Sequence, residues 1–477
     1  MNAVLFSYMT ACEAIFMGVK NDFSKGSIVK NIMNLAIPMI LAQLFNVLYS
    51  IVDRIYIGKI PENSFQALTG IGICMPIISL VAAFANLFGM GGAPLCSIER
   101  GRGNNEEAEN IMGNSFIMLI TSGILLTMLG LLMRKPMLYL FGASDTTFIF
   151  ANQYITIYLL GNVFVMISLG MNHFINAQGF GRIAMKTVIL GAAANIILDP
   201  IFIFVFNMGV QGAALATIIS QFLSSLWVVR FLISKEAILK LNKGSFILKK
   251  YRVRRIVLLG TSGFVMQFTN SLVQVLCNST LQIFGGDLYV GIMNVINSIR
   301  EILSLPVSGL SSGAQPVIGF NYGAREYKRV KSSIKFITIV SVAFNTVMWL
   351  LLQSFPGFFI RVFNSDPVVL RAGIPVTRIF YSCFFTMALQ YSGQTTFVAL
   401  GKSKKAVFFS LFRKVILVIP LVIILPRFLG LGSNGVFLSE PISEFIGGTA
   451  CFTTMVMTVR KELKENKQEK EIGKGKI

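Results

Sequence analysis

Long apolar segments recur along the whole chain and leave few folds open to it. Residues 184–206 and 332–360 are two examples, and each exceeds the roughly 20 residues that a helix needs to cross the hydrocarbon core of a bilayer. Of the 477 residues, 54% are hydrophobic and 13% are charged, whereas about 25% of the residues of a soluble protein are charged. We therefore predict an all-α polytopic membrane protein.

Glycine, proline, asparagine and clusters of charge divide the chain into twelve predicted transmembrane helices. They are expected near residues 31–58, 68–97, 112–133, 148–172, 184–206, 209–233, 254–284, 289–318, 332–360, 373–398, 405–428 and 431–458. An even number of spans places both ends of the chain on the same side of the membrane.

The lysines and arginines predict which side that is. With the N-terminus in the cytoplasm, 33 of the 42 lie in cytoplasmic segments, including nine in 230–255 and five in 402–414. The opposite loops hold six, and three lie within spans. The positive-inside rule then places both termini in the cytoplasm. The net charge of +21 is explained by this topology and by anionic lipid headgroups, so no nucleic-acid partner is expected.

The two halves of the chain resemble each other at a spacing of about 222 residues. Residues 208–222, "MGVQGAALATIISQF", align without a gap on residues 431–445, "LGSNGVFLSEPISEF". Six spans in each half give the halves one orientation, which predicts two pseudo-symmetric six-helix lobes with a cavity between them, as in many transporters. The predicted regions are a cytoplasmic N-terminal segment (1–30), an N-lobe (31–233), a basic linker (234–253), a C-lobe (254–458) and a charged tail (459–477).

Metal and enzyme chemistry find little support in the sequence. The six cysteines are scattered without a CxxC pair, and the single histidine, His173, cannot build a metal cluster. A membrane-embedded transferase would need clustered Asp pairs or His and Glu sites, and a P-loop is incomplete before "LGKS" (400–403). We therefore expect no cofactor, no metal and no enzymatic activity.

Polar residues follow one face of the first span and recur in its repeat. The first face carries Gln43, Asn46, Ser50 and Asp53, and the seventh span carries Gln267, Asn270, Gln274 and Cys277 at an offset of 224. Spacings of three and four residues place each set on one helix face. The amides either hydrogen-bond between helices or line a cavity. Asp53 is the stronger functional candidate, because ionisable groups inside spans are costly.

A second acid, Asp199, stands in the apolar segment "NIILDPIFIF" (195–204). Its repeat equivalent is Leu421 or Val422, so the acid occurs in one lobe only. Asn195 lies one turn earlier, and Pro200 predicts a bend with an exposed carbonyl. Both acids are expected in the outer half of the bilayer. Two carboxylates in one poorly solvated pocket favour proton uptake, which predicts coupling to protons.

The second half carries its own buried charges. They are Arg300, Glu301, Arg378, Glu440 and Glu444. Because their signs nearly cancel, a paired structural network is favoured over a second ion site, with Arg300 and Arg378 as the expected partners of the glutamates.

Three segments resemble the multidrug and toxic compound extrusion (MATE) transporters, and most of all their bacterial MepA-like branch. They are "LAIPMILAQLFNVLYSIVDRIYIGKI" (35–60), "NIILDPIFIF" (195–204) and "GLSSGAQPVIGFNYGARE" (309–326). The resemblance covers all twelve spans. It implies the V-shaped, two-lobed MATE/MOP fold and export of amphipathic, often cationic drugs, driven by a proton or sodium gradient.

The resemblance also implies roles for single residues. Asp53 and Asp199 match the acids of the first and fifth helices, and Asn195 matches the asparagine one turn before the second acid. The hydrogen-bonding positions of the N-lobe fall on Tyr154, Asn172 and Thr217, and the first-helix proline associated with bending falls on Pro38.

The chain departs from the sodium-coupled, NorM-like pattern. That pattern has acids on the seventh and tenth helices, whereas this chain has Cys277 and Asn278 on the seventh and "QYSGQ" (390–394) on the tenth. Proton coupling in the N-lobe is therefore favoured, with sodium coupling as an alternative. A flippase for lipid-linked oligosaccharides is a further alternative, although it would be expected to have a strongly cationic cavity.

The expected protein is thus a bacterial plasma-membrane antiporter. Its partners are small-molecule drugs, protons or sodium ions, and membrane lipids, and it is expected to act as a monomer. The candidates for the substrate cavity are Gln43, Asn46, Gln267, Asn270, Gln274 and Met293, the last because a methionine gives a soft surface for varied aromatic drugs.

Overall fold

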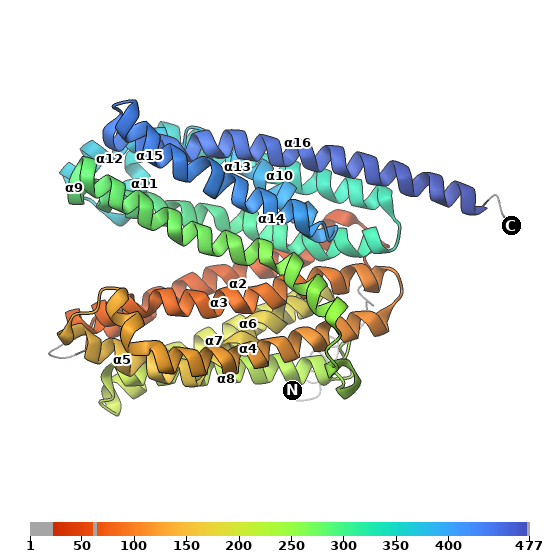
Figure 1. Ribbon diagram of the computed structural model, residues 1–477, viewed down its shortest axis with the longest axis horizontal. Helices are drawn as coiled ribbons and strands as arrows, with labels where there is room; N and C mark the ends of the chain where they lie inside the picture. The colour runs from red at the N-terminus through yellow and green to blue at the C-terminus, as the bar shows by residue number, and fades with distance from the viewer. Residues whose placement is uncertain (1–21, 61–63, 475–477) are drawn as a thin grey trace, which may run out of the picture.

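The computed structural model describes residues 22–60 and 64–474, and every regular element in this part is a helix (Figure 1). The first 21 residues of the predicted segment 1–30 and the last three of the predicted tail 459–477 lie outside it. The helices of the first half are α2 (Ile28–Ile57), α3 (Ser64–Gly101), α4 (Asn105–Leu140), α5 (Asp145–Leu160), α6 (Asn162–Ala177), α7 (Gly181–Pro200), the π-helix η1 (Ile201–Val205) and α8 (Gly209–Ile233).

The second half begins after a short connection that contains the 3-10 helix η2 (Lys243–Phe246). Its elements are α9 (Lys250–Gly323), α10 (Tyr327–Ser354), α11 (Pro356–Phe363), α12 (Pro367–Phe380), the 3-10 helix η3 (Phe384–Thr386), α13 (Met387–Ala399), α14 (Ser403–Leu411), the π-helix η4 (Phe412–Val418), α15 (Ile419–Phe428) and α16 (Gly432–Lys474).

The membrane spans agree with the predicted number once three breaks are counted. Within residues 22–60 and 64–474, nine helices are long and apolar enough to cross a membrane. Two more spans are bent pairs, α5 with α6 at 57° and α12 with α13 at 46°. Helix α9 breaks at Gly286, whose φ of 65° and ψ of −167° suit glycine, into two stretches that are each longer than a span requires.

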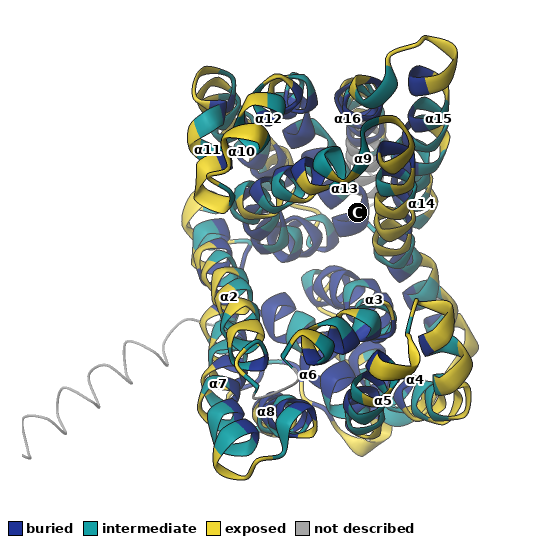
Figure 2. Ribbon diagram, turned by 90° about the vertical axis from the view of Figure 1, so that its left-hand side faces the viewer, coloured by how far each residue is buried: buried dark blue, intermediate teal, exposed yellow. Residues whose placement is uncertain are grey.

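The spans form two lobes that meet at one end. Figure 1 shows α2 to α8 in one bundle, the N-lobe, and most of α9 to α16 in another, the C-lobe; Figure 2 shows the same division end-on. One apolar cluster lies wholly in the C-lobe, between Val273 and Phe437. The other joins residues of both lobes, such as Leu87 and Leu310. The lobes therefore share a core only near the connection 234–249, which we call the linker end.

Glycines allow the lobes to touch at the linker end. A Cβ atom added to Gly91 of α3 would collide with the carbonyl oxygen of Ile256 on α9. A Cβ atom added to Gly260 of α9 would collide with the carbonyl oxygen of Leu87 on α3. Only glycine permits so close an approach of two backbones, as in other small-residue contacts between membrane helices.

The repeat supplies a second contact of the same kind between α2 and the end of α9. A Cβ atom on Gly313 would lie 2.5 Å from the backbone nitrogen of Ala36, and one on Gly309 would press on Ile40. Gly313 follows Gly91 of α3 by 222 residues, and Gly309 follows Leu87 of α3 by the same spacing. The interlobe contact is therefore pseudo-symmetric and consists largely of backbone.

Two ion pairs fasten the start of α9 to the N-lobe at this same end. Arg255 Nη2 lies 3.1 Å from Glu99 Oε1, and Arg252 Nη2 lies 2.6 Å from Glu107 Oε2. The Arg252 side chain is only 6% exposed, so the second pair is the better shielded from solvent.

Candidate functional site

Asp53 and Asp199 lie close together inside the N-lobe, on α2 and α7. Asp199 is fully buried and Asp53 is half-buried. Their carboxyl groups are within hydrogen-bonding reach of each other when one of them is protonated. Asp53 Oδ1 and Asp199 Oδ2 are both buried and accept no hydrogen bond from the described residues. These two oxygen atoms can therefore bind a shared proton or another cation.

The polar residues around Asp199 come from α7 itself and from two other helices. Asn195 Nδ2, one turn earlier on α7, donates to Asp199 Oδ1 at 3.2 Å and to Thr217 Oγ1 of α8 at 3.5 Å. Tyr154 of α5 is buried, and its hydroxyl group is within reach of Thr217. The structure thus brings five of the six residues predicted for cation coupling into one hydrogen-bonded neighbourhood.

Asn172 of α6, the sixth, lies beside this neighbourhood and closes a small cavity. Its Nδ2 atom donates to the carbonyl oxygen of Ala184 at 3.2 Å. With Asn46, Asn195 and Thr217 it lines a space of about 60 Å³. A polar space of this size holds water molecules and not a drug.

Neither Asp53 nor Asp199 has a basic partner, because no ion pair of the described residues involves them. Arg54 follows Asp53 directly but is exposed. Adjacent residues occupy different faces of a helix, so Arg54 and Asp53 do not share a face. The N-lobe site is accordingly anionic.

The two prolines predicted to bend helices behave differently. Helix α2 continues through Pro38 as one element. Helix α7 ends at Pro200, and the next five residues form the π-helix η1. Proline lacks the N–H group that would continue the α-helical ladder, which explains the change of helix type directly after Asp199.

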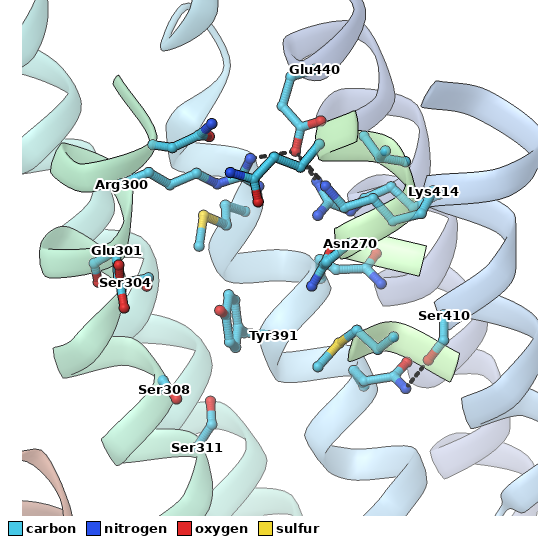
Figure 3. A pocket seen from close by; sticks show the side chains of 18 of the residues that line it. Asn270, Arg300, Glu301, Ser304, Ser308, Ser311, Tyr391, Ser410, Lys414 and Glu440 are labelled. Atoms are coloured by element: carbon cyan, nitrogen blue, oxygen red, sulfur yellow. Dashed lines mark hydrogen bonds and ion pairs between the residues drawn. The ribbon is translucent and has the colours of Figure 1, made fainter. Parts of the chain in front are cut away.

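A much larger cavity, of about 590 Å³, lies in the C-lobe (Figure 3). Asn270, Gln274 and Met293, three of the predicted cavity residues, line it together with Met90 from the N-lobe. Its volume is that of a drug-sized binding site. The remaining candidates are divided: Asn46 lines the small N-lobe cavity, whereas Gln43 and Gln267 line neither cavity.

Five charged residues form a buried network at one wall of the large cavity. Glu440 Oε1 lies 2.6 Å from Arg300 Nη1, 3.1 Å from Arg413 Nη1 and 2.9 Å from Lys414 Nζ. Glu444 Oε1 lies 3.1 Å from Arg300 Nη2 and 3.5 Å from Arg413 Nη1. The predicted paired network therefore exists, although its cations are only partly those expected.

Arg378 was wrongly predicted as a partner of the glutamates. Its Nε atom donates to the carbonyl oxygen of Gln353 at 3.2 Å, and the residue is exposed. Arg413 and Lys414 take its place, although the charge count assigned both to a cytoplasmic segment. Arg413 and Lys414 lie in the first turn of the π-helix η4. The turns of a π-helix are wider than those of an α-helix, which allows these two neighbouring residues to approach the same glutamate, Glu440.

Comparisons with known proteins agree with this architecture. The chain is 25% identical over 425 residues to the multidrug export protein MepA of Staphylococcus haemolyticus, which covers 89% of the chain and 92% of that protein. It is 23% identical to MepA of Staphylococcus saprophyticus, covering 94% of the chain and 97% of the relative. Both alignments span nearly the whole of each protein.

Solved structures show the same fold. A MATE protein in a bent conformation superposes with a TM-score of 0.88 at 21% identity and covers 94% of this chain and 98% of its own. An outward-facing multidrug resistance MATE transporter of the MOP superfamily gives a TM-score of 0.86 at 22% identity, covering 94% and 99%. The MatE family profile matches residues 38–201 and 264–424. With its two lobes and twelve spans, the chain belongs to the MatE family, the MATE efflux transporters.

Proposed function

We propose that the protein is a secondary multidrug exporter that expels amphipathic, often cationic drugs in exchange for protons. Curated relatives that align along nearly their whole length are multidrug export proteins. The observation that carries the coupling is the pair Asp53 and Asp199, two adjoining carboxyl groups with unsatisfied buried oxygens and no basic partner among the described residues.

A shared proton fits this site for a physical reason. Two carboxylates that approach each other without a cation repel, and burial removes the water that would stabilise them. Uptake of one proton lowers the charge of the pair and supplies the missing hydrogen bond. Entry of water, or of a cationic drug nearby, favours release of that proton. Asn195, Thr217, Tyr154 and Asn172 hold the geometry of the pair.

The protein lies in the bacterial plasma membrane as a monomer, with both termini and the linker 234–253 in the cytoplasm, where its lysines and arginines meet anionic lipids. Residues 31–233 and 254–458 form the two lobes, and residues 459–477 form the tail. Gln43, Asn46, Gln267, Asn270, Gln274 and Met293 contribute to the path of the drug, and Pro38 and Pro200 to changes of helix shape.

The coupling ion can be tested in energised inverted membrane vesicles. Uptake of a fluorescent cationic drug should collapse when a protonophore is added and should be unaffected when sodium is replaced by potassium. If uptake follows an imposed sodium gradient and persists in the presence of the protonophore, the coupling ion is sodium and not the proton.

The role of the acid pair can be tested with Asp199→Asn, which keeps the shape of the side chain and removes its charge. Drug uptake should fall to the level of vesicles without the protein, while the amount of inserted protein is unchanged. Asp287→Asn is a matched control, because Asp287 is exposed beside the Gly286 break and should leave uptake intact. Transport by Asp199→Asn at the normal rate would make Asp199 a purely structural residue.

A further inference from the structure

The large C-lobe cavity carries charges that export of cationic drugs does not require. At one wall, the cations of Arg300, Arg413 and Lys414 face the carboxylates of Glu440 and Glu444. Three positive charges against two negative ones leave a surplus cation in a buried place. Such a surplus is costly unless an anion neutralises it.

Lys414 has donors that its neighbours in this group do not use. It is only 6% exposed, and its single hydrogen bond in the described residues runs from Nζ to Glu440 Oε1 at 2.9 Å. An ammonium group has three donors. Because Lys414 lines the cavity, its two remaining donors are available to a molecule inside.

The opposite wall of the cavity carries a carboxylate. Glu301 of α9 lines the cavity and is exposed, and no ion pair of the described residues involves its carboxyl group. Figure 3 shows Glu301 and Lys414 on opposite sides of the space. The amides of Asn270 and Gln274 also line it. The cavity as a whole is therefore nearly neutral, but its charges are separated.

We infer that this cavity binds zwitterionic amphiphiles, with the anionic group of the ligand at Lys414 and Arg413 and its cationic group toward Glu301. Charge-assisted hydrogen bonds from an ammonium and a guanidinium would hold a carboxylate at one wall. The methionines Met90, Met266 and Met293 would contact its apolar body. This inference rests on the proposed export function and assigns a place in the C-lobe cavity to the acidic group of such a ligand.

A matched pair of dyes tests the inference by direct binding. The probes are a zwitterionic rhodamine with a free carboxylate and the methyl ester of the same dye, which is only a cation. Fluorescence anisotropy with the purified full-length protein in detergent requires no ion gradient. The free acid should bind more tightly than the ester. An equal or weaker affinity for the acid would overturn the inference without any variant.

Variants then locate the anion site. Lys414→Met leaves two cations facing Glu440 and Glu444, so the network stays balanced and the fold is expected to be retained. It should weaken binding of the acid by about tenfold, as expected for loss of a charge-assisted hydrogen bond, and leave the ester unchanged. Lys414→Arg should restore the preference for the acid. Lys405→Met, at the linker end of the same span, is the control.

Equal losses for both dyes in Lys414→Met, or no loss, would show that the network is only structural. Asp199→Asn separates this inference from the proposed function, because it should stop efflux yet keep the preference for the acid. If the unaltered protein exports neither dye but prefers the acid, the export proposal fails and the binding site stands.

Discussion

In the N-lobe the candidate site has two carboxylates beside a 60 Å³ space, whereas in the C-lobe three cations and two carboxylates border a space of 590 Å³. The internal repeat shows at which positions the charges of the two lobes differ. Glu440 stands where the N-lobe has Thr217, and Glu444 stands where it has Gln221. A duplicated frame has thus kept its helical positions while the charges at those positions diverged.

The divergence follows the surroundings of each acid. Asp199 accepts a hydrogen bond from Asn195 and pairs with no cation in the described part of the chain, so its charge is open to change. Glu440 is held by three cations, so its charge is fixed by its neighbours. One lobe is therefore arranged for a variable charge and the other for a constant one.

The largest effect is expected from breaking the fixed network. Glu440→Gln leaves Arg300, Arg413 and Lys414 with the single carboxylate of Glu444, and it should lower the free energy of unfolding by about 3–5 kcal/mol. Denaturation of the purified protein measures this. Glu326→Gln, which changes an exposed glutamate, should have almost no effect. A loss below about 1 kcal/mol for Glu440→Gln would contradict the network as described.

Adding a methyl group to the interlobe contact should have the next largest effect. Gly260→Ala places a Cβ atom against the carbonyl oxygen of Leu87, so we expect a loss of about 1–3 kcal/mol in stability and slower transport. Gly263→Ala is the matched control, since its nearest neighbour is the flexible side chain of Met90, 3.4 Å away. Equal behaviour of the two variants in unfolding and transport assays would refute the close contact.

A smaller effect is expected in the N-lobe from Asn195→Ala. The substitution removes the hydrogen bond to Asp199, which is worth about 1.5 kcal/mol or more when the acceptor is charged, and it should slow drug efflux by about tenfold. Initial rates in vesicles measure it. Asn152→Ala, on α5 outside the pair, serves as the comparison and should change the rate little. An unaltered rate for Asn195→Ala would remove Asn195 from the site.

The smallest effect should come from Arg378→Ala. Because Arg378 is exposed and bonds only to the carbonyl oxygen of Gln353 through its guanidinium, stability should change by less than about 0.5 kcal/mol. Thermal unfolding beside Glu440→Gln gives the contrast directly. A loss as large as that of Glu440→Gln would place Arg378 back in the network.

The sequence was sufficient for the number of spans, the two lobes and the meeting of Asp53 with Asp199. Apolar runs are a strong signal for spans. The internal repeat drew attention to Asp199, because the second half has no acid at the equivalent position. Asn195 could be placed because a spacing of four residues brings two side chains onto one helix face.

The partners of Glu440 could not be predicted in the same way. Arg413 and Lys414 lie near the end of a basic stretch, and counting charges along the chain assigned them to the cytoplasm. Their inward position depends on the π-helix η4 and on which helix packs beside α16. No local sequence pattern predicts either feature. The bends within the two broken spans were missed for the same reason. The break at Gly286, in contrast, falls between the predicted spans 254–284 and 289–318 and is confirmed.

The glycine contact at the linker end has a thermodynamic consequence. Carbonyl groups such as those of Leu87 and Ile256 lie within helices, whose backbone groups are hydrogen-bonded along the helix itself. Parting the glycine surfaces themselves would leave no backbone donor without a partner, so the electrostatic cost is confined to the neighbouring ion pairs Arg255–Glu99 and Arg252–Glu107. Two conformations that differ mainly in apolar contact can have nearly equal free energies, and a ligand with only modest preference for one of them can then shift the population between them.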